Sequence, residues 1–409
     1  MIKYEKAKKI LSKAKIKIKN EKILAENSLK RVCAKSVFSP NDYPASNNTA
    51  FDGYAVNSKE TIGLNSKNKK KFRILKTIAA GDNPKISNIK KYSTVEVMTG
   101  ALIPSKFDTI IPVEAACCYP NKQNAKFIII DKKILKNNHI RFKGSDYKKN
   151  DKIISDGDII NSAHLLAFKS LGVKNIVVKK KPLIIFFSTG NEVSENYKIP
   201  NWKVRNSNSH YINSLSKNLF FDFIDGGILR DKDEKVFEKK IRKLNISKFD
   251  IIITNGAVSA GKFDFIPTVI KKFKLSYFFK GVAIRPGKPI MFGKFKNKNQ
   301  SFFGLPGNPI SSAACFKFFV IPYLRAILKM KNEKSFKARL KKTYIKKKKF
   351  TRFIKAKLLI NKNSFLEVDV LKGQESFRIK SFTKSNVWAL FKSGKSTFKK
   401  GELIDCFNL

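Results

Sequence analysis

Four apolar runs between residues 176 and 328 constrain the fold of this chain most, because each of them carries a glycine-rich loop. The runs are "PLIIFFSTG", "FIDGGILRD", "DIIITNGAVSAG" and "SFFGLPGNP", and helical stretches such as "KVFEKKIRKL" lie between or after them. Strands that alternate with helices are typical of a mostly parallel, doubly wound sheet, which binds ligands beyond the carboxyl ends of its strands. We therefore expect an α/β domain over residues 176–328, with a binding site at its glycine-rich edge.

The remaining residues indicate further domains, since a chain of 409 residues is too long for one ordinary core. Residues 44–140 hold short apolar segments broken by Gly, Pro and Asn, which is typical of a β-rich domain. Residues 345–409 return to short strands with turn signals and predict a small β domain. Helical spacing is expected near the N-terminus and over residues 162–171.

The formal net charge of +54 raises the question of a nucleic-acid partner. Of the 85 basic residues, however, only 11 are arginine, and the lysines are spread along nearly the whole length. Specific nucleic-acid readers depend on arginine forks and on clustered aromatic platforms. We therefore expect no nucleic-acid partner, and a positive field that attracts small anions.

Several function classes are not supported by the sequence. The apolar runs are much shorter than the roughly 18 residues of a membrane span, and the lysine-rich N-terminus is unlike a secretory signal, so we expect a cytoplasmic protein without a membrane partner. Five cysteines form no C-x-x-C pair and three histidines are scattered, which argues against a zinc cluster or a disulfide frame. The adjacent Cys117 and Cys118 are expected to be alternating strand residues.

Two of the glycine-rich loops could bind an anion. In "FFSTGNEV", Ser188 and the following backbone N–H groups face the sheet edge, with Glu192 at the rim, although the same letters also suit a plain turn and helix cap. In "DIIITNGAVSAGKFDF", Gly256 and Ser259 allow close backbone approach, and Asp264 follows. This second loop lacks G-x-G-x-x-G, so a phosphate fits it better than a dinucleotide.

Two further segments favour a compact oxyanion. In "GVAIRPGKPIMFG", two prolines stiffen a turn that carries Arg285 and Lys288, although a basic pair could be incidental in so lysine-rich a chain. In "FFGLPGNPISSAACF", a strand ends before Pro306, Gly307 and Asn308, and a helix is expected to begin near Ser311 with open N–H groups.

The stretch "NNTAFDGYAV" contains an Asp-Gly pair that is a turn dipeptide when taken by itself. It also gives the first motif of a family resemblance. "AFDGYAV", "MTGALIP", "STGNEV", "NGAVSAGKFDF", "IRPGKPIMFG" and "GLPGNPIS" occur in the order of the motifs of the molybdopterin molybdenumtransferases, the molybdenum insertases of cofactor biosynthesis. "GSD", "NSNSHYI", "FTRF" and "GQESFRIKSF" extend the match from about residue 4 to the C-terminus.

The resemblance implies a multidomain α/β plus β chain. An elongated domain would combine residues 1–43 and 141–175, a β-rich domain would occupy 44–140, the α/β domain 176–328, and a C-terminal β domain 329–409. It implies a homodimer with clefts shared between chains and a possible molybdopterin adenylyltransferase partner. The implied reaction inserts molybdate into adenylylated molybdopterin and releases AMP, promoted by a divalent cation such as Mg²⁺.

The resemblance also implies roles for individual residues. The matching positions would be catalytic at Asp52, Glu192, Asp231 and Asp264, of which Glu192 and Asp264 would hold the metal. Substrate binding would fall to Thr99, Asp146, Ser188, Gly256, Ser259, Lys280, Pro306, Gly307 and Asn308. Molybdate would contact Arg285, Lys288, Ser311 and Arg352, with Ser376 or Ser381 as further candidates.

Departures from the family pattern leave alternatives open. Asn191, Asn206 and Lys262 stand where the family usually has Asp, and Asn255 opens the loop that usually begins S-G-G. Asparagine retains hydrogen bonding but loses the charge, which affects metal affinity. One alternative is a lone molybdopterin adenylyltransferase, for which the N-terminal motifs would be surplus. The other is a non-catalytic protein that binds anions or nucleic acid through its positive surface.

Overall fold

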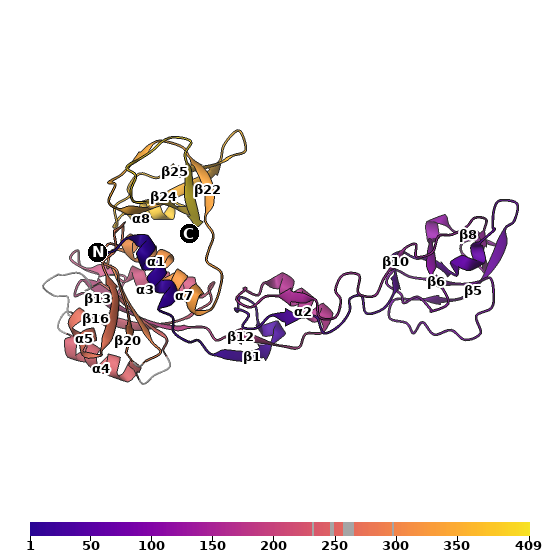
Figure 1. Cartoon of the computed structure of the whole chain (residues 1–409), viewed down its shortest axis with the longest axis horizontal. Helices are drawn as coiled ribbons and strands as arrows, with labels where there is room; N and C mark the ends of the chain where they lie inside the picture. The colour runs from indigo at the N-terminus through magenta and orange to yellow at the C-terminus, as the bar shows by residue number, and fades with distance from the viewer. Residues whose placement is uncertain (231–232, 246–248, 257–265, 297) are drawn as a thin grey trace. The chain divides into compact units, whose positions relative to one another are not determined.

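The structure is a computed structural model that describes residues 1–230, 233–245, 249–256, 266–296 and 298–409. The chain divides into two compact units, each considered by itself (Figure 1). Unit 1 contains Met1–Lys35, Ser155–Asn161 and Ile176–Leu409, and unit 2 contains Ser36–Ile154 and Ser162–Asn175. The finer four-part division remains a prediction.

A six-stranded sheet in unit 1 confirms the expected doubly wound α/β domain (Figure 1). In spatial order its strands are β16 (Asp222–Leu229), β13 (Leu183–Thr189), β17 (Ile251–Asn255), β21 (Ser301–Leu305), β20 (Met291–Phe295) and β18 (Leu275–Lys280). The first four are parallel, whereas β20 and β18 run antiparallel to their neighbours. A short parallel pair, β14 (Val193–Ser194) and β15 (Val204–Arg205), follows the end of β13.

Both faces of this sheet are buried. In β13, Ile184 and Phe186 belong to one hydrophobic cluster, whereas Ile185 and Phe187 belong to another. This near-continuous apolar strand therefore needs helices on both sides. The helices of the domain are α3 (Ser207–Ser216), α4 (Glu234–Asn245), α5 (Ile266–Lys272), α6 (Pro309–Cys315) and α7 (Ile321–Ile327), with a π-helical turn at Phe316–Val320 between the last two.

The helical segment Pro309–Ile327 is long and apolar enough to span a membrane by length and composition alone, which the sequence analysis did not expect. Within the fold, however, 78% of it is buried inside the protein. Phe316, Phe319 and Tyr323 contribute to the first hydrophobic cluster. The segment is therefore placed as a core helix of the α/β domain.

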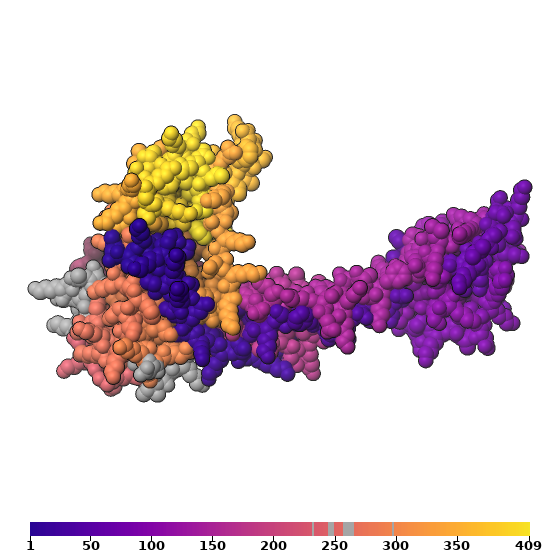
Figure 2. Space-filling model, viewed as in Figure 1, coloured from indigo at the N-terminus to yellow at the C-terminus, as the bar shows by residue number. Residues whose placement is uncertain are grey.

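The N-terminal helix α1 (Tyr4–Lys13) joins two parts of unit 1. Tyr4, Ala7 and Leu11 are buried at helical spacing, and the Tyr4 ring meets Phe319 and Phe353 with centroid distances of 5.5 and 5.2 Å. Figure 2 shows this indigo helix between the orange α/β residues and the yellow C-terminal residues. The remaining early elements of unit 1 are β1 (Asn20–Leu24), paired with β12 (Asn175–Lys179), and the 3₁₀ turn Ala25–Asn27.

The C-terminal part of unit 1 is a small barrel-like β domain. β24 (Thr351–Ile360) pairs with both β25 (Leu366–Val370) and β26 (Val387–Phe391), and this double pairing closes the sheet. Closure removes exposed strand edges. The other elements are β19 (Ile284–Arg285), β22 (Phe336–Leu340), β23 (Tyr344–Ile345), α8 (Ile379–Thr383), β27 (Thr397–Phe398) and β28 (Leu403–Asn408).

Unit 2 is β-rich around one six-stranded sheet. Its spatial order is β7 (Thr109–Pro112), β4 (Gly53–Val56), β6 (Ser93–Val97), β5 (Lys70–Ile78), β9 (Phe127–Ile130) and β8 (Cys117–Tyr119). Cys117 is exposed and Cys118 is half-buried in β8, so they are alternating strand residues as expected. The remaining elements are β2 (Val37–Phe38), β3 (Asn48–Thr49), β10 (Ile140–Arg141), β11 (Lys152–Ile154), α2 (Ser162–Leu171) and the 3₁₀ turns Ser58–Thr61 and Val113–Ala115.

Candidate active site

An oxyanion cavity of about 600 Å³ lies in unit 1 between the α/β domain and the C-terminal β domain. It gathers all four residues predicted to contact molybdate. Its lining consists of Arg285, Pro286, Gly287, Lys288, Pro289, Ser311, Arg352, Gln374, Glu375, Ser376 and Phe377. Strand β19 pairs in parallel with β24, with Arg285 in register with Arg352, which brings two guanidinium groups to the same edge. Ser381, the other candidate, lines a different cavity.

The electrostatics of the oxyanion cavity favour an anion. Arg285 and Lys288 are exposed, and the Arg285 guanidinium lies 4.8 Å from the centroid of the Phe350 ring. Arg352 is half-buried, and its Nε is buried without a hydrogen-bond partner among the described residues. The single carboxylate of the lining, Glu375, forms an ion pair with the Nε of Arg378 at 3.2 Å. Because a buried donor without a partner is costly, an oxyanion beside Arg352 would satisfy it.

Gly287 fixes the basic turn beneath this cavity. Its φ is +101°, and a Cβ there would clash with the Cys315 Sγ of α6. Only glycine allows both the left-handed backbone and this close approach. α6 begins at Pro309, and the N–H of Ile310 donates to the Ser376 carbonyl oxygen at 3.2 Å. The N–H groups at its start are therefore not all open, contrary to the prediction.

The end of β13 carries a hydrogen-bond network that the sequence analysis missed. The buried Ser188 Oγ donates to Asn206 Oδ1 at 2.7 Å, and Asn206 Nδ2 donates to Glu195 Oε1 at 2.5 Å. Glu195 also lies 3.6 Å from His210 Nε2. Ser188 was predicted to bind substrate, but here its hydroxyl is engaged with Asn206. In the sequence, Asn206 was noted as a departure from the family pattern, whereas Glu195 was not singled out.

A second network joins the end of β17 to the "LPGNP" turn. Asn255 Nδ2 donates to the Pro306 carbonyl at 2.7 Å and to Ser312 Oγ at 3.0 Å. Asn208 Nδ2 donates to Asn255 Oδ1 at 2.6 Å and to the Gly307 carbonyl at 2.7 Å. The departure at Asn255 therefore has a structural role, because its carboxamide positions the predicted substrate loop.

The other predicted residues of the α/β domain that the structure describes make no hydrogen bond in these networks that involves their side chains. Gly256, with φ +96°, follows β17 and lies beside Gly307, whereas Asn308 is exposed directly before α6. Glu192 is exposed, and its carboxylate folds back over Gly190. Lys280 is exposed at the end of β18 and is not part of the oxyanion cavity. Asp231, Ser259, Lys262 and Asp264 lie outside the described residues.

In unit 2, Asp52 accepts two hydrogen bonds from Thr99. The backbone N and the Oγ1 of Thr99 lie 2.6 and 2.7 Å from Asp52 Oδ1. These bonds lower the pKa of the exposed Asp52, the hydroxyl contributing most, so the group is a carboxylate. Gly53 is not the corner of a turn, as its sequence suggested, but the first residue of β4. A Cβ there would clash with the Ile111 carbonyl oxygen of β7.

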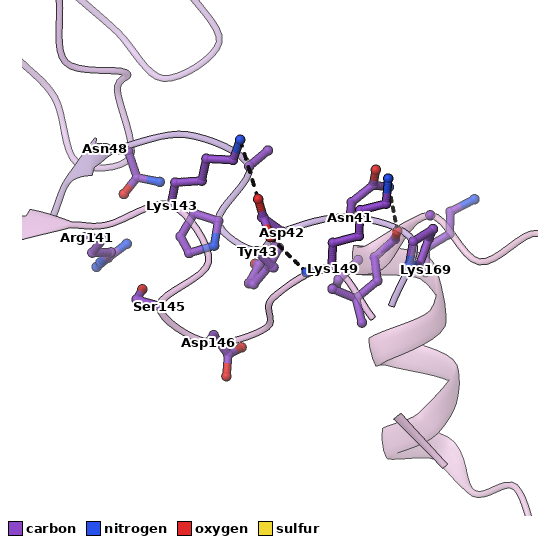
Figure 3. Close-up of a pocket in the computed structure, with 16 residues that line it drawn as sticks. Asn41, Asp42, Tyr43, Asn48, Arg141, Lys143, Ser145, Asp146, Lys149 and Lys169 are labelled. Carbon is purple, nitrogen blue, oxygen red and sulfur yellow. Dashed lines mark hydrogen bonds and ion pairs between the residues drawn. The ribbon is translucent and has the colours of Figure 1, made fainter. Parts of the chain in front are cut away.

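Asp146 lies in a second cavity, of about 820 Å³, within unit 2 (Figure 3). The same cavity contains Arg141, Lys143 and Lys149. Asp42 accepts a hydrogen bond from the Lys149 backbone N at 2.8 Å and pairs with Lys143 Nζ at 3.4 Å, and these contacts lower its pKa, the first most strongly. Sequence reasoning missed Asp42, which lies about 100 residues before the basic stretch "RFKGSDYKK" that it contacts.

The predicted residues of unit 2 do not form one cluster, because neither Asp52 nor Thr99 lines the cavity of Asp146. Within the described ranges, moreover, no group of three or more His, Cys, Asp or Glu side chains is arranged to hold a metal ion. The structure thus brings all the predicted oxyanion residues together in unit 1, whereas the described carboxylates Asp52 and Asp146 of unit 2 do not share a cavity.

Comparisons with known proteins agree with this fold. The "MoeA N-terminal region (domain I and II)" family model matches residues 2–172, and the "Probable molybdopterin binding domain" model matches residues 185–326. The crystal structure of the molybdopterin biosynthesis MoeA protein from Pyrococcus horikoshii OT3 superposes with a TM-score of 0.83 at 24% identity, covering 100% of each chain. A molybdenum cofactor biosynthesis protein from Pyrococcus furiosus gives 0.60 at 16% identity, again over 100% of each chain.

Curated relatives extend the match to nearly the whole chain. The molybdopterin molybdenumtransferase of Staphylococcus epidermidis RP62A is 28% identical over 407 residues, covering 99% of this chain and 94% of the relative. That of Staphylococcus aureus COL is 28% identical over 388 residues, covering 94% and 90%. Both family models, the fold and these full-length relatives agree, and the chain belongs to the molybdopterin molybdenumtransferase family.

Proposed function

We propose that the chain inserts molybdate into the dithiolene of adenylylated molybdopterin, which releases AMP and forms the molybdenum cofactor. The observation that carries the proposal is the oxyanion cavity, where Arg285, Lys288 and Arg352 converge with Ser311. The named activity of the relatives, molybdenum transfer to molybdopterin, supports the reaction class. A lone adenylyltransferase is not favoured, because the match over residues 2–172 would be surplus to it.

The cavity suits the first step, which is to hold a tetrahedral dianion. Charge-assisted N–H donors from two arginines and a lysine would neutralise the anion, and the Ser311 hydroxyl adds a further polar partner. When a dithiol takes up MoO₄²⁻, two Mo–S bonds form, and one oxide leaves as water with the two thiol protons. The oxidation state of molybdenum does not change, so the protein needs to supply position and charge rather than a covalent nucleophile.

The carboxylates would act on the pyrophosphate. Asp52 is held ionised by Thr99, so it can orient a water molecule or a cation near the bond that releases AMP. Glu192 lies exposed at the end of β13. The magnesium ion implied by the resemblance needs only one or two carboxylates together with substrate phosphates and water. Glu192 would supply one of them, and Asp264, the other residue that the resemblance assigns to the metal, lies outside the described residues. When bound, such an ion would neutralise phosphate charge on the substrate.

The homodimer, the adenylyltransferase partner and the cytoplasmic location belong to the proposal as well, supported by the family resemblance. The direct test is reconstitution. The purified chain is incubated with adenylylated molybdopterin, molybdate and Mg²⁺, and the product is added to a molybdenum-free apoenzyme. We expect apoenzyme activity that requires all three components. Failure to activate the apoenzyme with any divalent cation would exclude the proposed reaction.

A further inference from the structure

Lys355 is a buried lysine whose charge is fully engaged by backbone. It lies on β24 three residues after Arg352, and it is 1% exposed. Its Nζ donates to the carbonyl oxygens of Gly373, Glu375 and Arg378 at 2.8, 3.2 and 3.0 Å. A buried ammonium is tolerated only when its three protons have acceptors, and here three carbonyls supply them.

Those carbonyls belong to residues 371–378, the wall loop, which forms one side of the oxyanion cavity. Gln374, Glu375, Ser376 and Phe377 all line the cavity. Lys355 itself does not line it. The ammonium therefore contacts the carbonyl oxygens of the wall loop without itself being part of the cavity lining.

Further hydrogen bonds fasten the wall loop, and among them the Ser381 hydroxyl donates to the carbonyl oxygens of Gly373 and Arg378 at 2.6 and 3.2 Å. The Gln374 carboxamide donates to the carbonyl oxygens of Lys355 and Leu371 at 2.8 and 2.7 Å, and it accepts from the Lys355 backbone N at 3.1 Å. The Ser376 carbonyl accepts from Ile310 N of α6. Among these contacts, those of the Lys355 ammonium come from a charged side chain outside the loop, and they reach three of its carbonyl oxygens. Charge-assisted hydrogen bonds are roughly twice as strong as neutral ones.

We propose that Lys355 is a positioning residue whose ammonium holds the wall loop in place against the oxyanion cavity and thereby sets the affinity for molybdate. The inference deepens the proposed function, which supplies the identity of the anion. A ligand binds only the fraction of molecules whose site is formed, so loosening the wall loop lowers the apparent affinity by the same fraction.

The test compares Lys355→Met, which keeps the length of the side chain but removes the donors, with Lys355→Arg, which keeps the charge. Lys337→Met is the matched control, because Lys337 belongs to the same β domain and its partner Asp405 retains Lys392 at 3.3 Å. Molybdate binding is measured by calorimetry without any pterin. Hydrogen exchange is measured on the peptide that spans residues 371–378, and the KM for molybdate is determined separately from kcat.

We expect Lys355→Met to weaken molybdate binding about tenfold and to speed exchange in the wall loop by a similar factor. Its KM for molybdate should rise about tenfold, while kcat at saturating molybdate stays within about twofold of the parent chain. Lys355→Arg should recover most of the affinity, and Lys337→Met should match the parent in every measurement. Unchanged molybdate binding in folded Lys355→Met would overturn the inference.

If Lys355→Met does not fold, a second variant tests whether loosening the wall loop weakens molybdate binding. Ser381→Ala leaves the buried ammonium in place and removes the hydroxyl that donates to the Gly373 and Arg378 carbonyl oxygens, and Ser381 does not line the oxyanion cavity. Faster exchange in the wall loop together with weaker molybdate binding would support the inference, and faster exchange with unchanged binding would refute it. Because neither measurement requires turnover, a chain that binds molybdate but releases no AMP would refute the proposed function and leave this inference standing.

Discussion

Replacing Arg352 with methionine should separate oxyanion binding from stability. Arg352 lines the oxyanion cavity, and its Nε is buried without a partner among the described residues. A hydrogen bond to a charged group is worth about 1.5–3 kcal/mol. The loss of this donor should therefore weaken molybdate binding by about 10- to 150-fold.

The free energy of unfolding of Arg352→Met should be equal to that of the parent chain or slightly higher, although molybdate binding becomes weaker. Arg352→Met removes a buried donor that lacks a partner among the described residues. Burial lowers the pKa of Lys346 and the charge of Arg352 lowers it further, so the variant also removes a repulsion between two positive charges. Both changes relieve an unfavourable state of the folded chain, so we expect stability to be unchanged or raised by up to about 1 kcal/mol.

Titration calorimetry with molybdate and urea unfolding provide the two measurements. Arg339→Met is the control, since Arg339 is an exposed arginine on β22 whose guanidinium lies over Phe365 instead of the cavity. It should alter neither molybdate affinity nor wall-loop exchange. The reasoning is refuted if Arg352→Met binds molybdate within twofold of the parent chain, or if it loses more than about 2 kcal/mol of stability, which would mark a structural role.

Three further predictions concern titration and metal. Thr99→Val should raise the pKa of Asp52, because it removes the hydroxyl that contributes most to lowering it. The stability that this carboxylate contributes is lost as pH falls through its folded pKa, so in the variant it should be lost at a higher pH. An unchanged Asp52 pKa in a ¹³C carboxyl titration would contradict this. Burial lowers the pKa of Lys355 to about 8, whereas Glu375 opposes and Arg378 reinforces that shift. Between about pH 8 and 10.4, Lys355 is therefore protonated in the unfolded chain but not in the folded one. The free energy of unfolding of the parent should rise with pH over this range, relative to that of Lys355→Met. Urea unfolding at pH 7.5 and 10 measures the difference. Chelation should abolish AMP release, and Glu192→Gln should raise the Mg²⁺ concentration needed to restore it about tenfold or more; equal requirements would remove Glu192 from the metal site.

The sequence predicted the α/β domain because its signals are local. β13, β17 and β21 are apolar runs that end in glycine or proline, and each becomes a parallel strand. The antiparallel strands β20 and β18 were not predicted, since direction depends on partners distant in sequence. Gly53 was assigned to a turn because its letters are those of a turn, whereas the actual constraint is the Ile111 carbonyl of a neighbouring strand.

In the candidate site, too, the sequence identified individual residues but not their arrangement in space. Arg285, Lys288 and Ser311 were identified from motifs, but their convergence with Arg352 depends on the pairing of β19 with β24. Lys355 was not singled out, because one lysine among many carries no sign of burial in the sequence. Its contact with the wall loop becomes visible only when β24 and residues 371–378 are folded together.

Release of AMP from adenylylated molybdopterin is the measurement that tests the central claim most directly. The purified chain is mixed with this substrate and Mg²⁺, with and without molybdate, and AMP is quantified over time alongside the Arg352→Met variant. We predict AMP release that depends on molybdate and that needs a higher molybdate concentration in the variant. An absence of AMP with any divalent cation, or release that is identical with and without molybdate in both proteins, would contradict the account.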